Sequence, residues 1–271
     1  MRRIVPLAVT LALAPVMLAP SAGAAVQAVS HRPLISVGAN KSNNWSGYNQ
    51  GTLEQGNKLF NEVAGDWTVP TATNHKAGEA EFSSTWVGIG GGCIDASCTT
   101  TDSTLIQAGT EQDVSATGVA SYSAWWELIP ATSVTISTVG VKAGDHVHVD
   151  IGEAVRNSNI WTITLKNVTS GKTFTMTTPY SSTHATAEWI EETPVVVGTS
   201  GTGVGPLPNL STVNIDLAKA NNVPAGLKAS EELQLINSSG TPLATPSAPD
   251  SDTDGFNDCA YAASCAAPSS S

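Results

Sequence analysis

The chain has 271 residues, the length of one large domain or of two ordinary ones. Charged residues make up only 13%, and 23 Asp and Glu against 12 Lys and Arg leave a net charge of −11. This excludes nucleic acid as a partner, because phosphate binding needs clustered Lys and Arg. The abundance of Gly, Ser, Thr and Val argues against a helical bundle or a coiled coil.

The amino terminus has the three parts of a secretory signal peptide. Met1-Arg2-Arg3 is charged, residues 4–20 are apolar, and residues 21–25 are small. A membrane anchor is the alternative, but the run is short and contains three prolines. We expect residues 1–24 to be removed on export and residues 25–43 to form a short propeptide or a disordered arm. The mature protein is then extracellular, free of the membrane and, we expect, monomeric.

Short segments of alternating apolar and polar residues, bounded by Gly, Pro, Asn or Ser, recur along the rest of the chain. Residues 159–165 and 173–177, separated by a Ser-Gly turn, predict a β-hairpin. Other predicted strands are 44–50, 60–68, 82–90, 103–109, 118–128, 132–136, 146–151, 186–192, 211–216 and 231–236. So many strands without a linker favour an all-β fold, an antiparallel β-sandwich in one domain over residues 44–265, followed by a tail at 266–271.

Two segments depart from the strand pattern. Residues 195–208, rich in Gly, Thr and Pro, predict a long loop, and such loops are often functional. Residues 216–221 could form a single helical turn. Of the five histidines, His31 falls in the expected disordered arm and has no predicted role.

Four cysteines in an exported chain predict disulfides. Local pairing of Cys93 with Cys98 and of Cys259 with Cys265 is preferred over the two other connectivities. A zinc site is the rival, but spacings of five and six residues do not fit the usual ligand pattern. We therefore expect neither a metal nor a cofactor.

The sequence has no zinc-protease, serine-hydrolase, P-loop or dinucleotide motif. Instead, four segments combine Trp with carboxylate or carboxamide groups. Strand alternation places Gln107 on one face with Leu105, and Glu188 on one face with Glu192. Polar groups among such apolar neighbours are unfavourable unless they have partners or a function. The segments are 85–91, 104–109, 122–130 and 187–194.

In these segments the chain resembles the eqolisins, or glutamic peptidases, which are secreted acid endopeptidases of fungi and some prokaryotes. The resemblance spans roughly residues 44 to 260, and its motifs occur in the family's order and spacing. Besides the four segments above, it includes 44–48, 67–70, 144–145, 167–172 and 254–256.

The resemblance implies a concanavalin A-like sandwich whose concave cleft binds an extended polypeptide. The family's catalytic Gln falls on Gln107 and its catalytic Glu on Glu192. Trp45, Trp86 and Glu127 match family positions that line or support the cleft.

The sequence departs from the fungal pattern at three positions. Gly90 and Ser123 stand where fungal enzymes often carry acidic residues, and Glu191 stands where an apolar residue is usual. Glu191 and Glu192 therefore compete for the catalytic role. We favour Glu192 because it shares a face with Glu188 and immediately precedes the end of its strand.

The chemistry of the two residues suits an acid peptidase. An ionised Glu192 can take a proton from water as the water attacks a scissile carbonyl, and can then protonate the leaving amine. The Gln107 amide can donate to the oxygen that becomes negative. A carboxamide does not titrate, and a glutamate is still partly ionised near pH 4.

Three other interpretations compete with the peptidase. Glu127 and Glu192 could be the two carboxylates of a glycoside hydrolase, since concanavalin-like sandwiches also cut polysaccharides. The chain could be a non-catalytic carbohydrate- or peptide-binding module whose Trp residues stack on the ligand. Gln107 and Glu192 could also be a buried hydrogen-bonded pair without a catalytic role.

Overall fold

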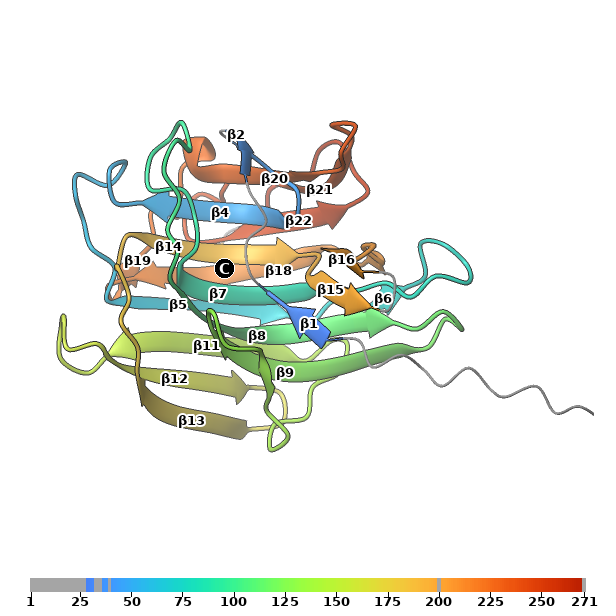
Figure 1. The fold of residues 1–271 in the computed structure, drawn as a ribbon, viewed down its shortest axis with the longest axis horizontal. Helices are drawn as coiled ribbons and strands as arrows, with labels where there is room; N and C mark the ends of the chain where they lie inside the picture. Colours follow the sequence, from blue (N-terminus) through green and yellow to red (C-terminus); the bar gives the residue numbers. More distant parts are fainter. Residues whose placement is uncertain (1–27, 32–35, 39, 199–200, 270–271) are drawn as a thin grey trace, which may run out of the picture.

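The alternating segments of the sequence form β-strands almost throughout. The computed structural model describes residues 28–31, 36–38, 40–198 and 201–269 (Figure 1). In these ranges the one helical element is the 3₁₀ turn η1, Ala229–Glu231. No helix in the described chain is long and apolar enough to cross a bilayer. The predicted signal peptide, residues 1–24, lies outside the described residues, as do the last two residues of the predicted tail.

The first sheet of the sandwich is antiparallel and carries the segments rich in Trp and Glu. In spatial order its strands are β10 (Val134–Thr135), β9 (Ala120–Leu128), β8 (Leu105–Val114), β7 (Ser84–Gly90), β14 (Thr186–Glu192), β4 (Trp45–Gly51) and β20 (Glu232–Ile236).

The second sheet begins with the predicted hairpin and ends on the same strand β20, which therefore joins the two sheets. Its order is β13 (Lys172–Pro179), β12 (Ile160–Asn167), β11 (His146–Glu153), β5 (Glu62–Thr68), β18 (Val213–Ala220), β22 (Phe256–Ala260), β21 (Pro242–Pro246) and β20.

Short strands complete the edges. β2 (Ser36–Gly38) pairs with β3 (Lys41–Ser42), and β3 runs parallel to β20. β19 (Val223–Pro224) pairs with the end of β18. A separate small sheet has the order β1 (Ala28–Ser30), β15 (Val195–Gly198) and β16 (Gly201–Val204), and β6 (Ala72–Thr73) pairs with β17 (Asn209–Leu210).

The main core lies between the two sheets, where alternate residues of each strand meet. Two buried tryptophans also join the sheets by hydrogen bonds. Trp189 on β14 donates to the carbonyl of Ala64 on β5 at 2.7 Å, and Trp67 on β5 donates to the Thr110 hydroxyl on β8 at 3.0 Å. These bonds satisfy the indole N–H groups, which would otherwise be unpaired in an apolar layer.

The sandwich and both local disulfides, Cys93–Cys98 and Cys259–Cys265, are confirmed. Two expectations were wrong. Residues 195–208 are not one long loop, because β15 and β16 form a hairpin that pairs with β1. Residues 216–221 do not form a helical turn. Residues 216–220 belong to β18, which bulges where its register against β5 shifts between Asp216 and Lys219.

We expect the Trp189→Ala substitution to lower the free energy of unfolding by about 3–5 kcal/mol, because it opens a cavity between the sheets and leaves the Ala64 carbonyl without its donor. Urea unfolding followed by circular dichroism measures this. The control is Val119→Ala at a side chain that is 65% exposed, where we expect a change within about 0.5 kcal/mol. Equal effects of the two substitutions would contradict the role given to Trp189.

Candidate active site

Strand register brings Gln107 and Glu192 to the same face of the first sheet. β7 lies between β8 and β14; its Gly88 pairs with Gln107 and its Ser84 with Glu192. Directly paired residues share a face, and Ser84 and Gly88 are four positions apart on one strand, so all four point the same way. This face carries its own apolar cluster, which is separate from the core between the sheets and includes Trp45, Trp86, Leu105, Trp125 and Ile190.

Glu192 is fully buried and held by three donors. Asn44 Nδ2 donates to Oε1 at 3.1 Å, Trp86 Nε1 donates to Oε2 at 2.8 Å, and His31 Nδ1 lies 3.2 Å from Oε2. Burial raises the pKa of Glu192 above its usual value, although His31 and Trp86 oppose the shift by stabilising the carboxylate. The carboxylate is therefore fixed in orientation and accepts its proton more readily than a glutamate in water.

Gln107 is also fully buried, and its amide donates in two directions. Nε2 donates to the backbone carbonyl of His31 at 3.1 Å and to Glu127 Oε2 at 2.9 Å. Burial raises the pKa of Glu127 to about 7, while the charge of Glu192 raises it further and the charge of His31 lowers it. Below about pH 7, Glu127 is thus mainly the neutral acid.

His31, to which the sequence assigned no role, lies against both residues and is buried rather than part of a disordered arm. Its backbone N–H donates to Glu127 Oε2 at 3.1 Å, and its ring stacks on Trp125 with centroids 3.6 Å apart. β1, which precedes His31, pairs with β15, and Figure 1 shows β1 passing over the first sheet near β8 and β9. His31, directly after β1, thus covers the part of the face that carries Gln107 and Glu192. No motif in the sequence signals this contact.

The His31 ring is surrounded by acidic groups. Burial alone would lower the pKa of His31, but hydrogen bonds and charges of Glu111 and Glu192 outweigh it and raise the pKa to about 10. Glu111, at 3.2 Å from Nε2, has its pKa lowered by this contact in spite of burial. Asp113 lies further along β8, and burial raises its pKa to about 7. The His31 imidazolium, placed between the carboxylates of Glu111 and Glu192, therefore holds His31 on this face.

Glu191 lies on the other face of β14. Glu191 pairs with Thr85 on β7 and with Ser46 on β4. Each of these is next in sequence to a residue on the face of Gln107 and Glu192, so it points to the opposite face. The Thr85 hydroxyl donates a 2.6 Å hydrogen bond to Glu191 Oε2. Complete burial raises the pKa of Glu191 well above its usual value. Of the two competing glutamates, Glu192 is the one that shares a face with Gln107.

The other predicted site residues lie around this pair. Trp45 packs edge-on against Trp86, with ring centroids 4.9 Å apart, while Trp86 holds Glu192 and Glu127 holds Gln107. Ser123 donates to Glu111 Oε2 at 2.6 Å. At Gly90 an added Cβ would lie 2.0 Å from the Thr104 carbonyl oxygen and φ is +100°, so an acidic side chain does not fit there without a change of backbone.

Comparisons with known proteins agree with the fold and with the sequence resemblance. The sequence profile of the Peptidase A4 family matches residues 43–254. Scytalido-glutamic peptidase with a transition-state-analogue inhibitor has a similar fold, with a TM-score of 0.62 and 19% identity over 80% of this chain and 98% of that chain. A search of curated proteins found no match.

Two further solved structures have the same fold. SCP-B, a member of the eqolisin family in complex with the tripeptide Ala-Ile-His, has a TM-score of 0.56 and 20% identity over 80% of this chain and 98% of that one. Aspergilloglutamic peptidase from Aspergillus niger has a TM-score of 0.52 and 21% identity over 66% and 99%. With the family profile covering most of its length, the chain belongs to the Peptidase A4 family and is a glutamic-type endopeptidase.

Proposed function

We propose that the chain is a secreted acid endopeptidase in which Glu192 activates water and Gln107 stabilises the oxyanion. The observation that carries this proposal is that one residue of the chain itself, His31, contacts both Gln107 and Glu192. The carbonyl oxygen of His31 accepts from Gln107 Nε2 at 3.1 Å, while its ring contacts Glu192. A substrate carbonyl that took the place of the His31 carbonyl would meet the amide donor in the same way.

The catalytic steps follow from these positions. Water beside Glu192 attacks the scissile carbonyl carbon, and its proton passes to the carboxylate. The carbonyl oxygen becomes negative and accepts from Gln107 Nε2. A bound substrate would shield this hydrogen bond from solvent and so strengthen it. The C–N bond then breaks, and the proton on Glu192 passes to the leaving nitrogen. Trp86 and Asn44 keep the Glu192 carboxylate in place throughout.

We further propose that residues 25–43 act as a propeptide, after removal of residues 1–24 on export, and that residues 44–265 form the monomeric extracellular peptidase. Two contacts support a blocking role for the segment. His31 lies where a substrate would meet Gln107 and Glu192, and β1 is fixed by pairing with β15. The two disulfides suit an oxidising compartment. SCP-B, whose fold is similar, forms a complex with the tripeptide Ala-Ile-His, which fits a face that accepts a short stretch of polypeptide.

Substitution at the two proposed catalytic residues tests the mechanism. After removal of the amino-terminal segment, we expect digestion of a denatured protein between about pH 3 and 5. Glu192→Gln should lower kcat by about 10²–10⁴ because the general base is lost, and Gln107→Ala by about 10²–10³ because the oxyanion loses its donor.

Glu191→Gln is the matched control, since Glu191 is equally buried, adjacent in sequence and on the opposite face. We expect it to keep most of the activity. Full activity of Glu192→Gln would refute the mechanism, and loss of activity in Glu191→Gln alone would move the general base to Glu191. Hydrolysis of a polysaccharide in place of protein would favour the glycoside hydrolase.

The pH profile tests Glu127. Because its pKa is raised to about 7, Glu127 is neutral in acid and becomes negative as pH rises through that value, next to the Gln107 amide and the developing oxyanion. Removal of His31 takes away a charge that lowers this pKa and also part of the burial that raises it. We therefore expect kcat to fall near pH 7 in the wild type, and Glu127→Gln to keep its activity there.

Glu188→Gln is the control for that profile. Glu188 is buried on the same face and burial also raises its pKa, but the Gln107 amide donates to Glu127 and to the His31 carbonyl, so we expect Glu188→Gln to leave the alkaline limb unchanged. The acid limb, where Glu192 becomes protonated, should be unchanged in both variants. An alkaline limb that persists in Glu127→Gln would exclude Glu127 as its cause, and complete inactivity of this variant at every pH would support two catalytic carboxylates.

Inhibition by a synthetic peptide of residues 28–38 tests the propeptide. Protonation of His31 stabilises docking of the peptide on the site. This contribution is fully present below pH 6.5, the ordinary pKa of His, and is lost as pH rises through about 10, the pKa of docked His31. Ionised Glu111, whose pKa is lowered on docking, stabilises it above the ordinary value of 4.5 and stops doing so as pH falls. We expect strong inhibition at pH 6 and an inhibition constant at least about tenfold higher at pH 3.5.

The matched peptide carries His31→Ala and should inhibit at least about tenfold more weakly at pH 6, since it cannot contact Glu111 or Glu192. Equal inhibition by both peptides, or inhibition that strengthens steadily toward pH 3.5, would contradict the proposed docking.

A further inference from the structure

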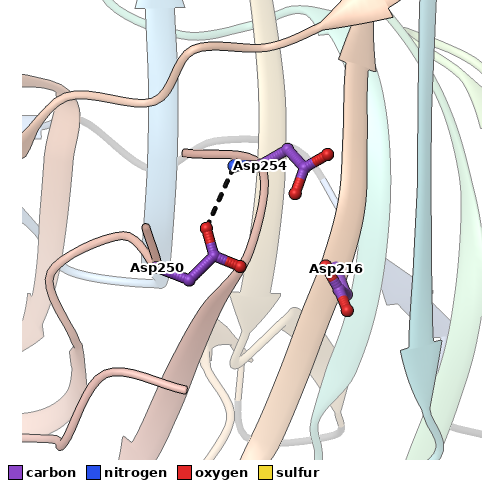
Figure 2. A group of neighbouring side chains, drawn as sticks. All are labelled: Asp216, Asp250 and Asp254. Carbon is purple, nitrogen blue, oxygen red and sulfur yellow. Dashed lines mark hydrogen bonds between the residues drawn. The ribbon is translucent and has the colours of Figure 1, made fainter. Parts of the chain in front are cut away.

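Three carboxylates converge on the second sheet, away from Gln107 and Glu192. Asp216 lies on β18, and Asp250 and Asp254 lie on the loop that joins β21 to β22. One oxygen of each lies within 4.8 Å of the other two. Figure 2 shows the three side chains directed toward the space between the loop and β18.

The loop has the sequence pattern of a calcium-binding loop. In residues 250–255, Asp-Ser-Asp-Thr-Asp-Gly, carboxylates stand at the first, third and fifth positions and glycine at the sixth, as in the first half of the 12-residue calcium loop. The twelfth position, where that loop has a bidentate Glu, is Tyr261. Asp216 from the neighbouring strand supplies a carboxylate in its place.

The two carboxylates approach closely over the backbone of Gly255. A Cβ at this position would lie 2.5 Å from Asp250 Oδ2 and 2.9 Å from Asp216 Oδ1, so any other residue would displace these side chains. Asp216 reaches the loop because β18 bulges directly after it. The bulge and the glycine together let oxygens from two separate segments meet.

A buried oxygen without a partner points to a missing ligand. The Asp254 side chain is 8% exposed, and its Oδ1 is buried without a hydrogen bond. Within the described ranges, no Lys, Arg or His forms an ion pair with Asp216, Asp250 or Asp254. A buried carboxylate oxygen without a hydrogen-bond partner is unfavourable unless a cation compensates it.

We propose that Asp216, Asp250 and Asp254 bind one Ca²⁺ ion, which fastens the β21–β22 loop to β18. Oxygens that bind Ca²⁺ lie about 2.4 Å from the ion, so two of them are at most about 4.8 Å apart, as these are. Carboxylate oxygens alone do not suit Zn²⁺, which prefers nitrogen and sulfur. The ion is structural and independent of the proposed peptidase mechanism.

Calcium titration of the full chain tests this site. After treatment with a chelator and its removal, isothermal titration with CaCl₂ at pH 7 should give one site with a Kd of about 10⁻³ M or tighter. At a hundredfold excess of Ca²⁺ over Kd, we expect the Tm to rise by about 5 °C or more. MgCl₂ at the same concentration should raise it by less than half as much, because Mg²⁺ gives up its water reluctantly.

Asp254→Asn and Asp216→Asn should each weaken Ca²⁺ binding at least about tenfold, since each removes one charged ligand. Glu79→Gln, an exposed acidic residue at another place, is the control for net charge and should bind as the wild type does. If a variant does not fold, Tb³⁺ bound to the wild type serves as the probe. Ca²⁺ that displaces Tb³⁺ from one specific site lowers the luminescence, and without such a site the luminescence does not change. No heat and no Tm shift at 10 mM Ca²⁺, or unchanged binding in both variants, would overturn the proposal.

Discussion

The pairing of β7 with β8 on one side and with β14 on the other is the constraint on which the site depends. It fixes which residues of the outer strands share a face, and it places Gln107 and Glu192 together although 85 residues separate them in sequence. A shift of either strand by one residue would turn one of the two toward the core. The buried tryptophans that bond across the sandwich, Trp67 and Trp189, hold this register by fixing the sheet against its partner.

Burial of several carboxylates on one face is the second feature that organises the molecule. Desolvation raises the pKa of Glu127, Glu188 and Glu192 and favours their neutral forms. Glu127 is neutral at acidic pH and then does not repel Glu192, whose ionised form the proposed reaction needs. The imidazolium of His31 compensates the charges of Glu111 and Glu192 when His31 is docked on this face. The low total of Lys and Arg leaves few alternatives.

The sequence predicted most of the fold, because half-buried strands alternate visibly and turns carry Gly, Asn and Pro. It failed where tertiary contacts override local preference. The segment 195–208 looked like a loop, since Gly and Thr dominate it, but β1 gives β15 a partner strand. The segment 216–221 looked able to form one helical turn, but residues 216–220 belong to β18, which carries a bulge there. At the site, the alternation of faces along β14 already favoured Glu192 over Glu191 as the catalytic residue. The structure places Glu191 against Thr85, on the opposite face of the sheet.

The sequence by itself determined the all-β class, a preference for the two local disulfide pairs, the resemblance to glutamic peptidases and the faces of Gln107 and Glu192 within their own strands. These properties depend on spacing of two to six residues, which a linear pattern records. The tertiary structure alone decided that the two faces coincide, that His31 lies between them, and that Asp216 joins the loop of Asp250 and Asp254. Each of these contacts joins segments far apart in the chain, and only packing of the strands brings them together.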